Sequence, residues 1–213
     1  MTVITPPVSA TKGERTRQTL LDAAIARFGR EGYRATSVAD IARDARLSGT
    51  AAYAYFPNKE ALFVAAVDED AAGVIVEGLA SVIDEKGADQ WRETLIFTLL
   101  DALDRHPLAR RVLAGLEPEF TVRLLDIPAL EQLRKASCER IRAQQLAGDV
   151  RPDVDARQIA NGLVTIVLSL LMSLIQTGND PATLLGRDVA AVVEAALSPP
   201  SGVAPGRPRR RPR

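Results

Sequence analysis

Helical spacing of apolar residues is the feature that most constrains the fold of this 213-residue chain. Near the N-terminus, apolar side chains fall at Leu20, Leu21, Ala24, Ile25 and Phe28, which is the spacing of a helix with one buried face. No run rich in Val, Thr and Tyr alternates with polar residues, so we expect no β-sheet. The sequence therefore predicts an all-α protein.

Cap and turn residues divide this pattern into segments. Gly32 is expected to end the first helix, Ser37 and Asp40 to form a capping box, and Ser48, Asn58 and Asp153 to act as N-caps. The helices expected are 14–31, a short one opened by Thr36-Ser37, one from Ser48 to about 55–57, 59–83, 89–104, 107–115, 117–147 interrupted at Ile127-Pro128, 153–177 and 181–197. Residues 1–13 are expected to be a flexible arm and residues 198–213 a disordered basic tail.

The charges are unevenly distributed, although 27 Lys and Arg balance 27 Asp and Glu. Residues 12–60 hold nine basic and six acidic residues, and residues 61–200 hold thirteen basic and twenty-one acidic ones. Residues 201–213 add five arginines and no acid. This asymmetry favours a protein whose N-terminal part meets phosphate while its larger part does not.

Composition argues against an enzyme. Cys138 is the single cysteine and His106 the single histidine, so a disulfide, a cysteine metal site and a histidine-based triad all lack their parts. The acid pairs Glu117/Glu119 and Asp153/Asp155 are interpreted as helix caps and solvated faces. We expect no catalytic residue, metal or cofactor. No signal peptide is recognised at the N-terminus, so a cytoplasmic location is expected.

Two short helices joined by a tight break at 45–48, after an amphipathic helix, form a helix-turn-helix pattern. The second helix begins with the small residues 48–52, so its first turn can enter a major groove. Tyr53, Tyr55 and Lys59 offer hydroxyls and a cation for phosphate oxygens. The expected small core consists of Phe28, Ile41, Phe56 and Leu62.

The segment 36–63 resembles the TetR family of transcriptional repressors, and the resemblance covers about residues 14–63. The closest matches to the family pattern are Thr36, Ile41, Ala42, Ala45, Ser48, Tyr53, Tyr55, Phe56, Lys59 and Leu62. The family commonly has glycine where Arg46 stands and often where Thr50 stands. Arg46 is expected to extend the basic surface, and Thr50 to contact a base or a phosphate.

The resemblance implies a three-helix DNA-binding domain, residues 14–57, followed by a larger helical ligand-binding and dimerisation domain, residues 58–197. It implies a homodimer on a pseudo-palindromic double-stranded DNA operator, released by a small-molecule effector that the sequence does not identify. The expected DNA-binding residues are Ser37, Arg46, Ser48, Gly49, Thr50, Ala51, Tyr53, Tyr55 and Lys59.

Residues 158–179 carry no charge, which leaves two interpretations. A membrane-associated helical protein using this run as a span is the alternative function. A soluble buried helix is favoured, because polar residues interrupt the run and only 162–175 is densely apolar, which is short for a span. The small polar side chains recur every four residues and form a ridge: Asn161, Thr165, Ser169, Ser173 and Thr177. The ridge allows close helix approach at a dimer interface, or its hydroxyls bond to carbonyls four residues earlier. The candidate interface residues are Leu163, Ile166, Val167, Leu170, Leu174, Val189, Val192 and Val193.

Ligand contacts are the least defined expectation. Candidates on the middle helices are Trp91, Phe97, His106, Phe120, Cys138 and Met172, and each is equally interpretable as a plain core residue.

Overall fold

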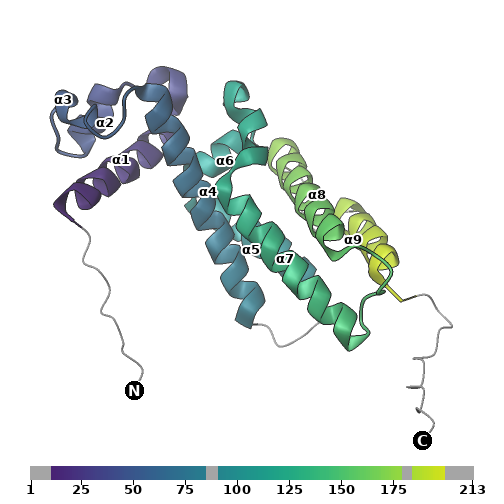
Figure 1. The fold of residues 1–213 in the computed structure, drawn as a ribbon. Helices are drawn as coiled ribbons and strands as arrows, with labels where there is room; N and C mark the ends of the chain where they lie inside the picture. The colour runs from purple at the N-terminus through teal and green to yellow at the C-terminus, as the bar shows by residue number, and fades with distance from the viewer. Residues whose placement is uncertain (1–10, 85–90, 179–183, 200–213) are drawn as a thin grey trace, which may run out of the picture.

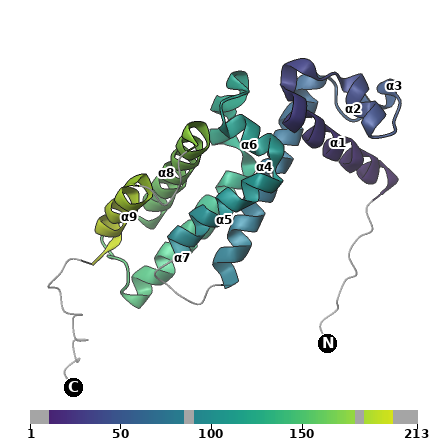
Figure 2. The ribbon, with the colours of Figure 1, turned by 180° about the vertical axis from the view of Figure 1, so that it is seen from behind.

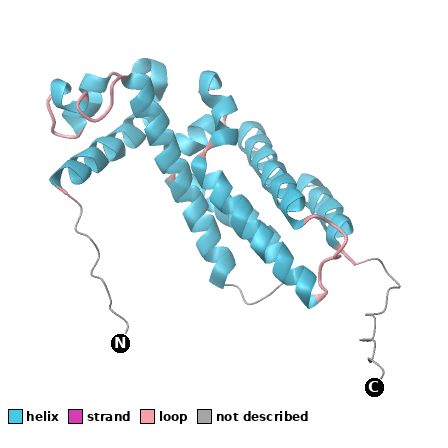
Figure 3. Cartoon of the chain, viewed as in Figure 1, coloured by secondary structure: helices cyan, strands magenta, loops and turns pink. Residues whose placement is uncertain are grey.

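The computed structural model describes residues 11–84, 91–178 and 184–199. Every regular element in these ranges is a helix, as Figure 3 shows, and no strand occurs among them. The all-α prediction is confirmed. The elements are α1 (Lys12–Ala35), α2 (Val38–Asp44), α3 (Gly49–Ala52), α4 (Lys59–Asp84), α5 (Trp91–Arg105), α6 (Pro107–Leu113), the 3-10 helix η1 (Pro118–Asp126), α7 (Pro128–Ala147), α8 (Ala156–Thr177) and α9 (Leu184–Leu197).

The molecule has a small head, α1–α3, and a larger body, α5–α9, which α4 connects. Figure 1 shows α4 starting beside the head and running down the body next to α5 and α7, and Figure 2 shows the same arrangement from behind. Helices α8 and α9 lie on the side of the body away from the head. This layout separates the predicted DNA-binding elements from the helices with the most apolar sequences.

The head is built around the predicted small core. Phe28, Ile41 and Leu62 are fully buried, and Phe56 is nearly so. Burial of a large aliphatic or aromatic side chain contributes about 1.5–3 kcal/mol, so these four residues fix α1, α2 and the start of α4 to one another.

Three of the predicted N-caps are present: Ser37, Asn58 and, at the start of α3, Ser48. The Asp40 N–H donates to Ser37 Oγ at 3.2 Å, and the Ser37 hydroxyl donates to the Asp40 carboxylate at 2.6 Å. The Ala61 N–H donates to Asn58 Oδ1 at 2.7 Å, so Asn58 caps α4. Each such cap contributes on the order of 1 kcal/mol.

Two predicted helix starts were misplaced. Helix α1 begins at Lys12, inside the expected arm, because Thr11 and Glu14 form a capping box in which the Thr11 side chain accepts from the Glu14 N–H at 3.2 Å. Helix α8 is capped by Asp155, which accepts from the Gln158 N–H at 2.8 Å. Asp153 instead accepts hydrogen bonds from Arg151, its neighbour in the preceding turn.

Two further expectations about the helices differ from the structure. Gly32 does not end α1 but kinks it, at φ 84°, and helical residues continue to Ala35. Residues 118–126 form a 3-10 helix rather than part of a longer α-helix. The expected start of the last helix at Asp180-Pro181, most of the N-terminal arm and residues 200–213 of the tail lie outside the described residues.

Candidate nucleic-acid interface

The turn between α2 and α3 has the hydrogen-bond pattern of a Schellman motif. The Arg46 N–H donates to the Arg43 carbonyl at 3.0 Å, and the Leu47 N–H donates to the Ala42 carbonyl at 2.7 Å. Leu47 packs against the head core, which supplies the apolar contact that usually accompanies this motif. The turn is therefore held both by backbone hydrogen bonds and by side-chain packing.

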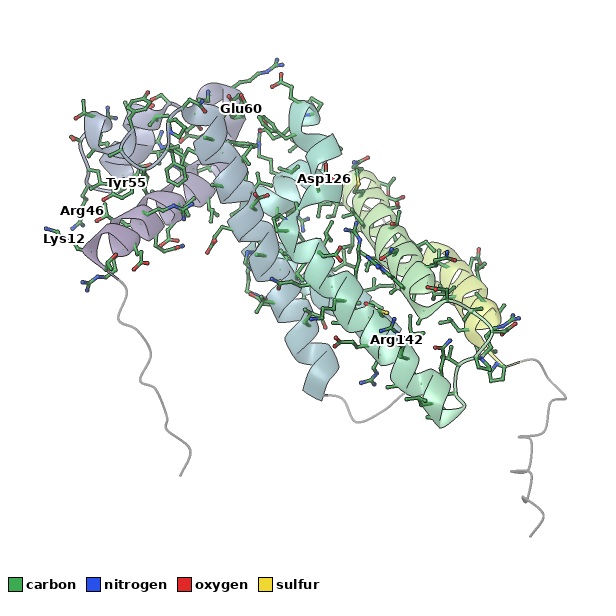
Figure 4. The ribbon with its side chains drawn as sticks, in the orientation of Figure 1. Lys12, Arg46, Tyr55, Glu60, Asp126 and Arg142 are labelled. Atoms are coloured by element: carbon green, nitrogen blue, oxygen red, sulfur yellow. The ribbon has the colours of Figure 1, made fainter. Side chains whose placement is uncertain are left out.

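Arg46 occupies the left-handed position of this turn, with φ 58°. A non-glycine residue in this region costs about 1–2 kcal/mol, which explains why glycine suits the position. Arginine at this position, unlike glycine, places an exposed guanidinium at the turn. Figure 4 labels Arg46 and Lys12 at the end of the head that points away from the body.

Helix α3 is short and presents small side chains. Ser48 caps it by accepting from the Ala51 N–H at 3.2 Å, and the Ser48 and Thr50 hydroxyls lie 3.1 Å apart. Ala52 is fully buried and fixes the helix to the head. Helix α3 ends at Ala52, so the predicted extent to about residues 55–57 was too long; the residues that follow form turns.

The two predicted tyrosine contacts lie in different environments. Tyr53 is 55% exposed. Tyr55 is half-buried and packs against the head core. The hydroxyl of Tyr53 is therefore more accessible than that of Tyr55. Another predicted contact, Ser37, is the N-cap of α2.

Two cations of the head rest on aromatic rings. The Lys59 ammonium lies 4.3 Å from the centroid of the Tyr33 ring, and the Arg17 guanidinium carbon lies 5.0 Å from that of Phe56. A cation over an aromatic face gains about 0.5–1 kcal/mol at exposed sites. Both charges are therefore positioned by contacts within the head.

Other basic residues of the head are engaged in ion pairs. Arg27 donates to Asp44 at 2.6 Å, and this hydrogen bond lowers the pKa of Asp44. Arg43 pairs with Asp40, whose pKa is lowered first of all by the Ser37 hydroxyl. Among the described residues no carboxylate pairs with a further group of head cations, which can therefore meet phosphate: Lys12, Arg15, Arg17, Arg46 and Lys59.

Glu117 joins the head to the body. Its carboxylate accepts from the Tyr33 N–H at 3.1 Å and from Arg111 Nε at 2.7 Å, and the residue is only 6% exposed. A Cβ at Gly32 would lie 2.7 Å from the Glu117 carboxylate oxygen, so only glycine leaves room for this contact. Glu117 is thus a buried partner of α1, and the interpretation of the Glu117/Glu119 pair as caps and solvated faces was wrong for this residue.

An aromatic cluster lies beside this junction. Tyr33 contacts Phe63 of α4 and Phe120 of η1 with ring centroids 5.0 Å apart in both pairs, and Phe63 lies 4.9 Å from Phe28. Burial is the main cause that raises the pKa of Tyr33. Head and body therefore share one apolar contact region at the C-terminal end of α1.

Asp70 of α4 holds the N-terminus of α6. One carboxylate oxygen accepts from the N–H groups of Leu108 and Ala109 at 2.9 and 2.8 Å, and the other lies 2.8 Å from His106 Nδ1. Glycine at position 73 is needed because a Cβ there would overlap the His106 ring. Helix α6 is therefore tied to α4 by Asp70 and, through Arg111, to Glu117.

The body contains a small apolar cavity of about 60 Å³. Five helices and the residue before α7 contribute to its wall, which consists of Ala71, Val74, Ile75, Leu99, Leu103, Ala109, Leu113, Ile127, Leu130, Leu133, Val164, Val167, Leu168 and Leu171.

None of the six ligand-contact candidates is part of this wall. Phe120 belongs to the aromatic cluster, His106 lies between α4 and α6, and Met172 is half-buried against the main core. Cys138 is buried in a second cluster, and Phe97 is exposed. The side chain of Trp91 lies outside the described residues.

The eight interface candidates are divided by the structure. Leu170 and Leu174 are buried within the protomer, whereas Ile166 and Val192 are exposed, the latter at 67%. The remaining four are half-buried: Leu163, Val167, Val189 and Val193. The polar ridge of α8 faces outward at Asn161, Thr165 and Ser169, and the Thr165 hydroxyl donates to the Asn161 carbonyl at 2.9 Å. The hydrogen bond to the carbonyl four residues earlier is therefore confirmed at Thr165, and the dimer interface stays a prediction.

The fold and this site define a helix-turn-helix DNA-binding protein. Residues 20–66 match the family described as bacterial regulatory proteins, tetR family. This match, together with the relatives below, supports assignment of the chain to this family of DNA-binding transcriptional regulators.

Relatives agree along most of the chain. The uncharacterized HTH-type transcriptional regulator YdgC of Bacillus subtilis is 26% identical over 203 residues, covering 87% of this chain and 95% of that protein. The HTH-type transcriptional repressor Rv1474c of Mycobacterium tuberculosis is 28% identical over 183 residues, covering 84% and 92%. Transcription regulation through DNA binding is the function shared by these proteins.

Solved structures share the fold. A tetR-family regulator from Mesorhizobium loti superposes with a TM-score of 0.66 at 19% identity, covering 89% of this chain and 100% of that one. FadR of Thermus thermophilus, a repressor solved in complex with lauroyl-CoA, gives 0.64 at 20% identity with the same coverage. Helix α8 is long and apolar enough to cross a membrane, but one such helix is weak support, and the match of residues 20–66 to DNA-binding regulators does not favour the membrane alternative.

Proposed function

We propose that this chain is a repressor that binds a pseudo-palindromic operator as a homodimer and is released by a small-molecule effector. The Schellman turn with its exposed Arg46 is the observation that carries the DNA-binding part. It holds the first turn of α3 after the Ser48 cap, in which Thr50 is exposed and Gly49 and Ala51 are half-buried, next to Arg46, which forms no ion pair among the described residues. The proposed base neighbours are Gly49, Thr50 and Ala51, and the proposed phosphate contacts are Ser37, Arg46, Tyr53, Tyr55 and Lys59.

The proposed division of labour follows the fold. Residues 14–57 read DNA, and residues 58–197 bind the effector and dimerise. A regulator of chromosomal genes works in the cytoplasm, which is the location we propose. The two heads of the dimer would meet successive major grooves, whose centres are about 34 Å apart.

Selection of sequences from a random duplex library, followed by titration at physiological salt, tests the DNA-binding proposal. We expect a palindromic consensus bound with a Kd on the order of 10⁻⁸ M or tighter, and at least about 10³-fold more tightly than unrelated DNA. The DNA upstream of the protein's own gene is the first natural site to examine. Binding without sequence preference would refute the proposal.

The outward face of α8 and α9 supports the homodimer. Small side chains at Gly162, Thr165 and Ser169 let another helix approach closely, and Ile166 and Val192 add exposed apolar surface beside them. A four-helix contact between two copies would cover this surface.

A charge placed on that face tests the dimer. Thr165→Arg puts a guanidinium in the proposed contact and should convert the protein to a monomer in light-scattering chromatography. Gln132→Arg places the same side chain on an exposed position of α7 and serves as the control. A Thr165→Arg protein that stays dimeric would place the interface elsewhere.

The ties of α6 support the response to an effector. Ala109 and Leu113 of α6 belong to the cavity wall, while Arg111 of the same helix holds Glu117, which in turn holds Tyr33 of α1. A ligand that displaces α6 therefore acts on the head through hydrogen bonds. To release DNA it must bind the released state more tightly, by about 1–3 kcal/mol for a usual coupling.

A further inference from the structure

The wall of the cavity is made of one chemical kind of side chain. All fourteen lining residues are alanine, valine, isoleucine or leucine, with no polar or aromatic side chain in the wall. An apolar wall of this kind offers water no hydrogen-bond partner, so it favours contact with hydrocarbon. The wall therefore selects for apolar ligand surface.

The charged groups of α4 and α6 that lie beside the wall are already paired. Asp70 is next to the wall residue Ala71, and its two carboxylate oxygens contact the backbone N–H groups of α6 and the ring of His106. The other ring nitrogen, His106 Nε2, lies 3.2 Å from a Glu77 carboxylate oxygen. Among the described residues, each basic side chain in and next to α6 also has an acidic partner: Arg105 with Glu77 and Asp101, Arg110 with Asp104, and Arg111 with Glu117. None of these cations is left to neutralise an anionic ligand group.

These two observations determine which ligand the site can hold. A carboxylate or phosphate inside the wall would lose its hydration without gaining a counterion, which is strongly unfavourable. A hydrocarbon chain loses no hydrogen bonds and gains from leaving water. We propose that the effector of this chain is an uncharged, predominantly aliphatic molecule that binds in this cavity; its role as effector rests on the function proposed above.

The size of the cavity indicates how such a molecule enters. At about 60 Å³ it is smaller than the roughly 150 Å³ that a dry cavity needs to hold benzene. A ligand must therefore push wall side chains apart, and seven of the fourteen are leucines. Because Ala109 and Leu113 are part of the wall, this expansion moves α6, the helix that holds Glu117.

A matched pair of probes tests the ligand class on the full-length protein. 1-Octanol and octanoate share one chain length and differ in charge at pH 7.5. Titration calorimetry and thermal unfolding should show saturable binding of 1-octanol, and binding of octanoate at least tenfold weaker. Octanoate binding as tightly as 1-octanol, or saturable binding of neither, overturns the proposal. Lauroyl-CoA is a third probe, and its binding more tightly than 1-octanol also overturns it.

A matched pair of variants tests the location. Val74 lines the cavity, while Val76, on the same helix, is 59% exposed. Val74→Phe should weaken 1-octanol binding at least tenfold and Val76→Phe should leave it unchanged, with helix content checked by circular dichroism. Val74→Leu adds one methylene and should weaken binding less, which keeps the test decisive if the phenylalanine variant fails to fold. Equal binding by the Val74 and Val76 variants overturns the assignment of the cavity.

A measurement of operator affinity distinguishes failure of this inference from failure of the proposed DNA-binding function. Adding 1-octanol should lower the affinity of the wild-type protein for its selected operator at least fivefold. Binding of 1-octanol at the cavity without any change in operator affinity overturns its role as effector class. Failure of the DNA-binding function shows itself without any ligand, as loss of sequence preference, while 1-octanol binding remains measurable.

Discussion

Lys59 offers the sharpest test of the interface, because its ammonium is seated on the Tyr33 ring and no carboxylate pairs with it among the described residues. If it contacts a phosphate, Lys59→Ala removes one contact per protomer and two per dimer. Each lost contact lowers the slope of log affinity against log salt by about 0.9, so the slope of the dimer should fall by about 1.8. Between 50 and 200 mM salt, the variant should then lose about twelvefold less affinity than the wild-type protein.

Fluorescence anisotropy with a labelled duplex at several salt concentrations measures this slope. The duplex need not be the operator, because a phosphate contact is independent of sequence. Lys135→Ala removes the same charge from an exposed position of α7 and is the control. An unchanged slope in Lys59→Ala, or an equal fall in Lys135→Ala, would refute the reasoning.

The Tyr33 ring adds a second readout. Tyr33→Leu removes the aromatic ring under Lys59 but keeps the Lys59 charge. The affinity for DNA should therefore fall about two- to fivefold per protomer, while the slope of log affinity against log salt stays the same. Tyr33→Phe keeps an aromatic face and should retain wild-type affinity. In a Lys59→Ala background, exchanging Tyr33 for leucine should have no further effect on DNA binding, provided that the variant is folded.

Four further perturbations follow from the head and its junction. Arg46→Gly should raise stability by up to about 1–2 kcal/mol, because it removes the cost of a non-glycine residue in the left-handed region, and should lower DNA affinity. Arg46→Val should lower stability below that of the wild-type protein, because a β-branched residue fits this region worse than arginine; thermal unfolding and anisotropy report both properties. Gly32→Ala should cost at least about 2 kcal/mol, since φ is 84° and the added Cβ meets Glu117, and an unchanged melting temperature would contradict this. Glu117→Ala should lower the free energy of unfolding by about 3 kcal/mol, because it leaves Arg111 and the Tyr33 N–H without their shared partner. Denaturant unfolding measures this loss, and Glu119→Ala, at an exposed position of η1, is the control. The hydrogen bond from Arg27 lowers the pKa of Asp44 in the folded protein, so this pair stabilises the head fully at pH values above the unfolded carboxyl pKa of about 4. The stabilisation is lost as pH falls through the pKa of Asp44 in the folded protein. Asp44→Asn should therefore make stability less dependent on pH below about pH 4.

Local patterns in the sequence were sufficient for the helices and the head. Phe28 and Ile41 were identified as core because each lies on the apolar face of its own helix. Ser37 and Asn58 were identified as caps because short polar residues cap helices. The helix-turn-helix pattern of the residues predicted the turn at 45–48, and the family resemblance added that position 46 is commonly glycine. Its left-handed backbone is what the structure adds.

Contacts between distant segments could not be predicted in this way. Glu117 and Asp70 look like ordinary surface carboxylates in sequence, because nothing near them in the chain shows which backbone N–H groups they will meet. The cavity escaped prediction for a related reason. Its wall is assembled from aliphatic residues that any helical core contains, so aromatic and sulfur-containing side chains were chosen as ligand contacts instead.

The bond between Tyr33 and Glu117 spans 84 residues of sequence, which bears on how the protein is made. A ribosome releases the head long before η1 exists, so the kink at Gly32 is synthesised without the carboxylate that secures it. The partners of Tyr33 at this junction, Glu117 and Phe120, are synthesised only after more than half of the chain. A fragment that stops after α3 lacks both of these partners. Maturation of the DNA-reading end is therefore completed late in synthesis, although that end is the first to emerge.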